Sequence, residues 1–397
     1  MRYHQEDSTR NRRRRIVFVT GTRADFGKLK PLIREVQQAP EFEYEVFVTG
    51  MHMLARYGST IHEITAAGFT NVHPYINQDA TAGNQMDLAL ATTLQGLGHY
   101  LREARADLLV IHGDRVEALA GAIAGAMNHV PVAHVEGGER SGTVDEMLRH
   151  AVTKLAHIHF CANPDARTRL LQLGEDPATV HVIGSPDIDV MLSTDLPSVS
   201  EVRDRYDIPF ATWSLLLYHP VTTEPHDQRR RARALVDALL GSDRHFVVIY
   251  PNNDAGSATI LEEYRRFEGV DRVRLIPSMR FEYFLTALRH ADLVLGNSSV
   301  GIREAPVYGV PTINVGSRQL DRYHGPTIRD VEEEAPALAA ALSHPPAAGR
   351  ADLHFGSGDS AQRFMAALRS EVMWSAPLQK RFVDLPVTSS VELHGVG

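Results

Sequence analysis

The feature that most constrains the fold is the alternation of short apolar runs with helical patterns. In the first half of the chain, runs rich in Val, Ile and Phe occur at 14–21, 44–50, 107–114, 130–138, 157–163 and 180–186. Helical patterns occur between or after them, at 28–39, 116–128 and 145–157. Strands that alternate with helices at this spacing predict βαβ units in a parallel sheet, with ligands at the carboxyl ends of the strands.

The alternation stops and then starts again, which predicts a second domain of the same kind. Residues 193–212 combine proline, serine and charged residues, as a linker with a short helix does. Apolar runs return at 213–221, 245–253, 273–278, 292–299 and 311–317. A chain of 397 residues is also too long for one ordinary hydrophobic core. The predicted fold class is α/β, with two doubly wound Rossmann-like domains and a cleft between them.

The same pattern sets the domain boundaries. We predict an N-terminal domain over residues 1–190, a C-terminal domain over 191–375 and a tail over 376–397. The segment 360–373 has a helical pattern and is predicted to fold back across the linker. The tail is expected to return to the N-terminal domain.

Composition excludes several classes of protein. The formal net charge of −8 argues against a nucleic-acid partner. Cys161 is the single cysteine, so no intrachain disulfide can form and a reducing compartment is expected. The arginines of 12–15 precede an apolar run too short for a signal peptide and are interpreted as a solvated lead-in to the first strand. Since no stretch approaches the roughly 18 apolar residues of a membrane span, we expect a cytoplasmic protein without membrane contact.

The segment GTRADFGK, residues 21–28, directly follows the first strand and begins a helix. The free N–H groups of a helix start suit an anion, and Arg23 and Lys28 add cations at the same end. The segment lacks the GxGxxG spacing, so it gives no support to a dinucleotide cofactor. A plain strand–helix turn with surface charges is an equally good interpretation of this segment alone.

Acidic residues follow two further strands. Asp114 in HGDR and Glu136 in HVEGGER both end apolar runs, and Asp145 and Glu146 begin the next helix. Each is also a reasonable helix cap or dipole partner. Because they converge on one sheet edge, we expect mutual repulsion to raise some of their pKa values toward neutrality. The group is therefore a candidate acid–base set, with Arg115 as a neighbouring phosphate ligand.

The second half carries a candidate diphosphate site in GNSSVGIREAPVYGVPTINVGSRQ, residues 296–319. Hydroxyls and N–H groups between a strand and a helix can hold a diphosphate, and these positions are Ser298, Ser299 and Gly301. Glu304 is positioned to accept from ribose hydroxyls, and Arg318 to add a charge-assisted phosphate contact. A serine cap with a salt-bridged helix explains the serines but not the whole group.

Other residues of the second half are less specific. His219 and the pair Asn252 and Asn253 follow strands on the cleft side. A single histidine in such a place is more often structural, so His219 gains weight only from its neighbours. Phe281 and Phe284 are interpreted as the buried face of a helix rather than a base-stacking site.

Together these motifs resemble the hydrolysing UDP-N-acetylglucosamine 2-epimerases, which feed sialic acid and related nonulosonic acid pathways. The resemblance runs in family order from residue 21 to 319 through GTRADFGKLKPLI, HGDR, AHVEGGERSGTVDEMLRHAVTKLAH, HPVTTE, PNNDAGS and GNSSVGIREAPVYGVPTINVGSRQ. It implies a GT-B fold, a UDP-sugar substrate and neither metal nor cofactor. It also implies elimination of UDP to a 2-acetamidoglucal and hydration to free N-acetylmannosamine. We also expect a homo-oligomer, either a dimer or a tetramer.

The resemblance assigns roles position by position. Asp114, Glu136 and Asp145 match the acidic residues of the family and His219 its active-site histidine, while Glu146 stays a rival to Asp145. UDP-binding positions, counted with the cationic and polar candidates above, are Arg23, Lys28, Arg115, Asn253, Ser298, Ser299, Gly301, Glu304 and Arg318. The carboxylate that removes the C2 proton is not assigned, with a weak preference for Asp114.

The sequence departs from the family at two places. The family usually continues Gln-x-Gly-Arg after the position of Arg318, whereas this chain has Gln-Leu-Asp-Arg at 319–322. Gly27 stands where some relatives have serine. The first change puts the loop shape and the sugar or phosphate specificity in doubt, and the second removes a hydroxyl near the nucleotide.

Several alternatives stay open. The same reaction on UDP-2,4-diacetamido-trideoxyglucose or on a GDP-linked sugar fits the motifs. A non-hydrolysing 2-epimerase, whose product stays linked to UDP, shares the fold. A GT-B glycosyltransferase is disfavoured by the acids of the SGTVDE segment, and a catalytically dead nucleotide-sugar sensor by the presence of all the acidic residues.

Overall fold

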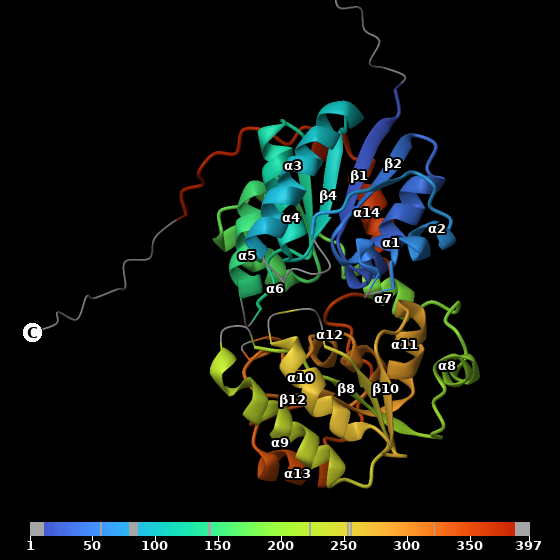
Figure 1. Ribbon diagram of the computed structural model, residues 1–397. Helices are drawn as coiled ribbons and strands as arrows, with labels where there is room; N and C mark the ends of the chain where they lie inside the picture. Colours follow the sequence, from blue (N-terminus) through green and yellow to red (C-terminus); the bar gives the residue numbers. More distant parts are fainter. Residues whose placement is uncertain are drawn as a thin grey trace, which may run out of the picture.

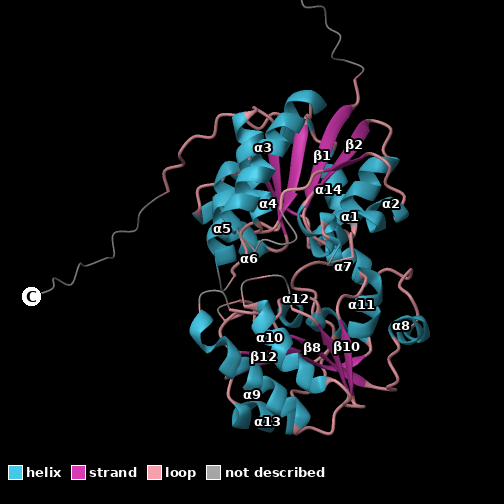
Figure 2. Cartoon of the chain, viewed as in Figure 1, coloured by secondary structure: helices cyan, strands magenta, loops and turns pink. Residues whose placement is uncertain are grey.

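A computed structural model of the chain contains two parallel β-sheets, one in each half of the molecule (Figures 1 and 2). The structure describes residues 12–55, 58–78, 86–141, 144–221, 224–251, 254, 256–320 and 322–385. The first sheet has the order β3-β2-β1-β4-β5-β6-β7 and the second the order β10-β9-β8-β11-β12-β13. Numbered within its own domain, each begins 3-2-1-4-5-6, the order of a doubly wound dinucleotide-binding fold. The predicted fold class is confirmed.

The first sheet is built from strands that the sequence pattern largely anticipates. Its members are β1 (Arg14–Thr20), β2 (Phe42–Val48), β3 (Val72–Pro74), β4 (Leu108–His112), β5 (Val132–Val135), β6 (Ile158–Cys161) and β7 (Val180–Val182). Along β1, Ile16 and Phe18 face one buried cluster, while Val17 and Val19 face another. Because successive side chains of a strand point to opposite faces, a strand buried on both faces is apolar throughout.

Helices cover both faces of the first sheet. One face packs against α1 (Arg23–Gln38), α2 (Ile61–Ala66), α14 (Ser360–Leu368) and α15 (Glu371–Trp374). The other packs against α3 (Met86–Ala104), α4 (Val116–Met127) and α5 (Val144–Leu155). Near the last strands lies α6 (Pro164–Gln172), whereas α7 (Pro186–Met191) packs on α1 and contributes to an apolar cluster of the second domain. Where α4 packs on the sheet, Gly121 and Gly125 leave room for the strand side chains Ile111 and Val132.

The second sheet repeats the design. Its strands are β8 (Trp213–Leu217), β9 (Phe246–Ile249), β10 (Val273–Ile276), β11 (Ala291–Gly296), β12 (Thr312–Val315) and β13 (Ile328–Val331). One buried face contains residues of α8 (Val199–Tyr206), α11 (Phe281–Arg289) and α12 (Val300–Arg303). The other contains residues of α9 (Gln228–Leu240), α10 (Ser257–Tyr264) and α13 (Ala335–Ser343). In the described part of the chain, no helix combines the length and apolarity needed to cross a membrane.

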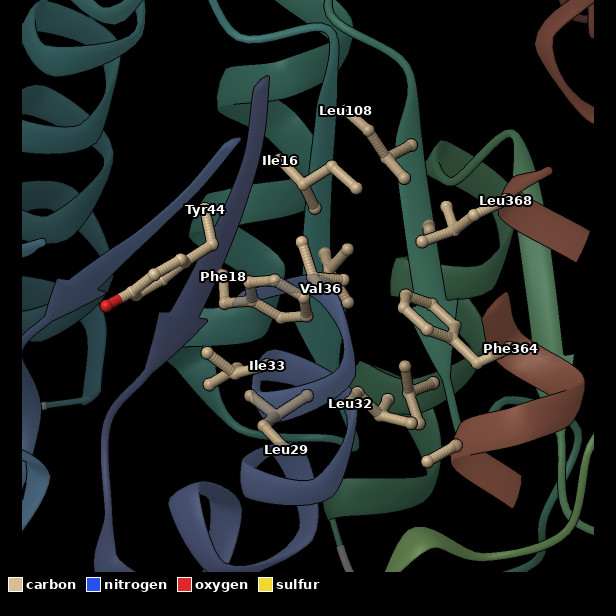
Figure 3. Packing of buried hydrophobic residues seen from close by; sticks show 14 of the residues in the cluster. Ile16, Phe18, Leu29, Leu32, Ile33, Val36, Tyr44, Leu108, Phe364 and Leu368 are labelled. Atoms are coloured by element: carbon tan, nitrogen blue, oxygen red, sulfur yellow. The ribbon is translucent and has the colours of Figure 1, made fainter. Parts of the chain in front are cut away.

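Helix α14 returns to the first domain, where Figure 1 places it beside α1 and β1. Its Phe364 and Leu368 are fully buried and point into the core of the first sheet (Figure 3). The ring of Phe364 lies 6.4 Å from that of Phe18 and 4.8 Å from that of Phe160. The chain therefore returns to the first core at α14, within the range predicted for the second domain. An amphipathic helix packs on whichever apolar face it reaches, and the sequence pattern does not say which.

Candidate active site

The carboxyl ends of the first sheet face the second domain, and the candidate acidic residues gather there. His112 ends β4, Asp114 follows it, and Glu136 directly follows β5. Glu136 has a left-handed backbone with φ of 62°, which costs free energy in a residue with a side chain. This strain, at a residue that ends a buried strand, marks Glu136 as a positioned group.

Glu136 lies in a cage of cations and donors drawn from both domains. Its carboxylate is 3.2 Å from Lys28 Nζ and 3.1 Å from His112 Nε2. Arg303 of helix α12 approaches to 2.7 Å, and the Ser185 hydroxyl donates to the same oxygen. The second domain thus supplies a cation directly to a carboxylate of the first. The sequence assigns Lys28 to the nucleotide, which stays a prediction; in the structure its ammonium contacts Glu136.

Burial alone would raise the pKa of Glu136, but Arg303, Lys28 and His112 hold that pKa well below its usual range. For His112, burial would lower the pKa, yet the charges of Glu136 and Asp25 raise it to about 9. His112 Nδ1 lies 3.5 Å from Asp25 Oδ1. At neutral pH the pair is therefore an imidazolium beside a carboxylate.

Asp114 is held by Arg149 of helix α5, which forms an ion pair with its carboxylate. The same guanidinium donates to the backbone carbonyl of Glu136 at 2.6 Å, so it links both strand ends. Burial would raise the pKa of Asp114, but Arg149 and Arg322 lower it. The expectation that repulsion raises these pKa values is therefore wrong for Asp114 and Glu136, because each carboxylate faces arginines that the spacing of the acids does not reveal.

The other two candidate acids, Asp145 and Glu146, lie at the start of helix α5. Glu146 accepts from the backbone N–H of Ser141 at 2.9 Å, a structural contact. Asp145 lies 4.0 Å from Arg318 of the second domain. Asp145, Arg115 and Arg318 line one interdomain pocket, together with Pro220 and Asp254. Of the two rivals, Asp145 is the one that lines this pocket.

His219 follows β8 and faces this region from the second domain. Its backbone N–H donates to Asn297 Oδ1 at 2.7 Å, and Asn297 Nδ2 donates back to its carbonyl at 2.8 Å. Arg318 donates to the Asn297 carbonyl at 3.1 Å. Burial and the Arg318 charge lower the pKa of His219 to about 3, so its imidazole is neutral at physiological pH. A neutral imidazole can accept a proton or a hydrogen bond.

The predicted diphosphate segment lies at the end of β11. Ser298 is buried and accepts weakly from the N–H of Val300 at 3.4 Å, and Ser299 precedes the short helix α12. Gly301 has a packing reason, since a Cβ there would lie 2.6 Å from Thr312 Cγ2. The two serines therefore lie between strand and helix as predicted, whereas Gly301 is the second residue of α12. Their contact with a nucleotide stays a prediction.

Glu304 lies at the end of α12, and its carboxylate is 3.8 Å from the ammonium of Lys28 in the first domain. Asp187 at the start of α7 is 3.1 Å from the same ammonium. Burial raises the pKa of Glu304 to about 7, and Lys28 only partly opposes this because Asp187 adds a like charge. Lys28 therefore joins three carboxylates, those of Glu136, Asp187 and Glu304.

Arg23 contacts side chains of both domains. It forms an ion pair with Glu63 at 2.5 Å and donates to the Ser278 hydroxyl of the second domain. Arg115 likewise pairs with Glu117 at 3.3 Å. Their nucleotide role stays a prediction, and Asn253 lies outside the described residues.

Two further sequence expectations concern helix α11. Phe281 and Phe284 pack in the apolar cluster of that helix, which agrees with their interpretation as a buried face. A Cβ on Gly27 would lie 2.9 Å from the Phe281 ring. The departure from serine at position 27 therefore has a packing reason, because helix α1 and Phe281 approach too closely for a side chain.

The sequence interpretation missed three arginines, one serine and one further carboxylate around the predicted acids. The missed residues are Arg149, Ser185, Asp187, Arg303 and Arg322. For some of these residues, their position in the sequence was a usable signal. Arg149 lies four residues after Asp145 and so on the same helix face. Arg303 directly precedes Glu304, and Asp187 follows a strand end as Asp114 does. Within the residues described, no group of three or more His, Cys, Asp or Glu side chains is arranged to hold a metal ion.

Two Rossmann-type domains that face each other across a shared set of carboxylates and cations define an α/β enzyme of the GT-B type. Residues 34–369 match the family described as UDP-N-acetylglucosamine 2-epimerase. The chain therefore belongs to the UDP-N-acetylglucosamine 2-epimerase family.

Individual relatives agree with this assignment. A UDP-N-acetylglucosamine 2-epimerase of Neisseria meningitidis serogroup B is 44% identical over 94% of this chain and 99% of its own. A Legionella pneumophila protein named UDP-N,N'-diacetylbacillosamine 2-epimerase (hydrolyzing) is 34% identical over 83% of this chain and 88% of its own. The structure of Methanocaldococcus jannaschii UDP-GlcNAc 2-epimerase in complex with UDP-GlcNAc and UDP superposes with a TM-score of 0.75 at 20% identity, over 89% of this chain and 99% of that one. This likeness confirms the fold.

Proposed function

We propose that this enzyme is a hydrolysing 2-epimerase. It converts UDP-N-acetylglucosamine, or a closely related nucleotide-linked acetamido sugar, and water into UDP and a free N-acetylmannosamine-type sugar. The observation that carries the proposal is the convergence of Asp114 and Glu136 with buried cations from both domains. The Legionella relative, named as hydrolyzing, supports the hydrolytic outcome.

The first proposed step is elimination. A base removes the C2 proton, the C–H electrons form the C1=C2 double bond, and the C1–O bond to UDP breaks with its electron pair on the diphosphate. Asp114 is our choice of base, because its carboxylate follows β4 at the sheet edge that faces the second domain and is ionised at neutral pH. The departing diphosphate needs preorganised cations and donors, a role proposed for Arg318, Ser298 and Ser299.

The second proposed step is hydration of the 2-acetamidoglucal. The oxygen of water bonds to C1, and a proton adds to C2 on the face opposite to the one that lost it. This step needs a proton donor and an acceptor close to the sugar. We propose that His112, which is protonated at neutral pH beside Glu136, is the proton donor to the sugar. Neutral His219 is the proposed acceptor for the water that attacks C1.

A second candidate substrate is supported by the name of one relative. The name of the Legionella relative refers to a diacetamido sugar, so the same reaction on a UDP-linked 2,4-diacetamido-trideoxy sugar is the first alternative substrate. A GDP-linked sugar is the next. The non-hydrolysing 2-epimerase differs from both in its product, which stays attached to UDP.

Product analysis separates these possibilities. The enzyme is incubated with each nucleotide sugar, and free sugar and nucleotide species are resolved by anion-exchange chromatography. We expect free 2-epimer and nucleoside diphosphate in equal amounts. A nucleotide-linked 2-epimer as the sole product would refute the hydrolysing assignment. Asp204→Asn, at an exposed position of helix α8, is the control for handling effects and is expected to match the wild type.

A further inference from the structure

A second interdomain cavity, of about 290 Å³, is lined by Glu139 and not by Glu136. Its walls come from α6 and the loop after β5 in the first domain, and from residues 322–324 and 354–355. It shares no lining residue with the pocket of Asp145 and Arg318. At roughly 30 Å³ per water it holds roughly ten waters. It therefore suits one small molecule and is at the lower limit for ligand pockets.

The charge of the cavity favours an anion. Arg140, Arg169 and Arg322 all line it. The side chain of Arg322 is only 9% exposed, and the nearest carboxylate among the described residues, that of Glu139, is 3.9 Å away. Its one hydrogen bond in that part of the chain goes to Gln319 Oε1 at 2.7 Å. Burial and the neighbouring Arg149 lower the pKa of Arg322 to about 10. Because the Glu139 oxygen nearest to Arg322 also pairs with Arg303, the buried Arg322 cation gains from a bound anion.

The cavity also offers an acceptor and a flat wall. Glu139 is 4% exposed, and its Oε1 has no hydrogen-bond partner among the described residues. Glu139 also lines the cavity, so its carboxylate is the acceptor we assign to a hydroxyl of the ligand. Tyr323 and His354 stack with their rings 4.0 Å apart and 8° from parallel. The chemistry thus combines an anionic group with hydroxyls.

We propose that this cavity binds a small hydroxylated anion, a monosaccharide that carries a carboxylate or a phosphate. Arg322 and Arg169 face its anionic group, and Glu139 accepts from a hydroxyl. The site communicates with the acidic residues through Arg303, which pairs with Glu139 on one side and with Glu136 at 2.7 Å on the other. An anion beside Arg322 therefore changes the charge balance around Glu136.

Binding to the intact enzyme tests this proposal. Isothermal titration calorimetry with glucuronate and with glucose 6-phosphate is expected to give a saturable signal that excess UDP does not displace. The stronger of the two ligands identifies the anionic group as a carboxylate or a phosphate. Absence of binding by both, or displacement of the sugar acid and the sugar phosphate by UDP, overturns the proposal.

Matched arginine variants assign the binding to this cavity. Arg169→Gln is expected to weaken binding at least tenfold, and Arg140→Gln, at an exposed side chain, provides a second test. Arg167→Gln lies on the same helix α6 outside the cavity and is expected to bind as the wild type does. Equal affinity in Arg169→Gln, Arg140→Gln and the wild type contradicts the proposal.

Discussion

The buried pairing of Arg303 gives a prediction with a worked magnitude. Its side chain is 4% exposed and joins Glu136 and Glu139, whose side chains are 4% and 5% exposed. Replacement by methionine keeps the volume but leaves two buried carboxylates without that counter-ion. Breaking a buried pair in this way costs about 3–5 kcal/mol, because an uncompensated charge stays buried. We therefore expect Arg303→Met to lower the free energy of unfolding by about that amount.

Urea unfolding followed by circular dichroism measures this loss, and a second variant separates the pair from simple packing. In a double-mutant cycle, Glu139→Gln is expected to recover part of the loss, since it removes one of the stranded charges. The control is Arg363→Met, whose exposed i,i+4 pair with Asp359 is expected to contribute below about 1 kcal/mol. A loss under about 1 kcal/mol for Arg303→Met, or no coupling to Glu139, would show that this ion pair does not hold the domains together.

Two further predictions concern the same cluster. His112 has a pKa raised from 6.5 to about 9, so it contributes about 3 kcal/mol of stability that is complete below pH 6.5 and lost as the pH rises through 9. The difference in unfolding free energy between wild type and His112→Gln should therefore shrink between pH 6.5 and 9, and a constant difference would contradict the assignment. Asp114→Asn is expected to abolish turnover and leave UDP affinity within a few-fold by calorimetry; a large loss of UDP affinity would instead place Asp114 in nucleotide binding.

The sequence predicts the fold well where strands are apolar and clearly bounded. Each apolar run assigned to a strand in the first sheet overlaps an observed strand, from β1 to β7. The short strands β3 and β13 were not predicted, because Val72–Pro74 and Ile328–Val331 have few apolar side chains and lie at the edges of their sheets. Helix α3 was also not predicted, although its 19 residues pack on α4.

The sequence predicted the acidic residues of the site but not the arginines that surround them. Asp114 and Glu136 follow strands, and the topology of a parallel sheet brings strand ends together. Their pKa values depend on Arg149 and Arg303, which come from a helix and from the other domain. Only the tertiary structure brings these cations to the acids, so reasoning from the carboxylates alone gave the wrong direction of the pKa shift. The contact of Gly27 with Phe281 is likewise a property of domain packing.

The central claim is that the C2 proton is removed during hydrolysis of the nucleotide sugar. Incubation of the enzyme with UDP-N-acetylglucosamine in D₂O, followed by proton NMR of the products, tests it most directly. We predict a free 2-epimer that carries deuterium at C2, together with free UDP. A free sugar that keeps its C2 proton, or a deuterated sugar still attached to UDP, would contradict the proposed mechanism.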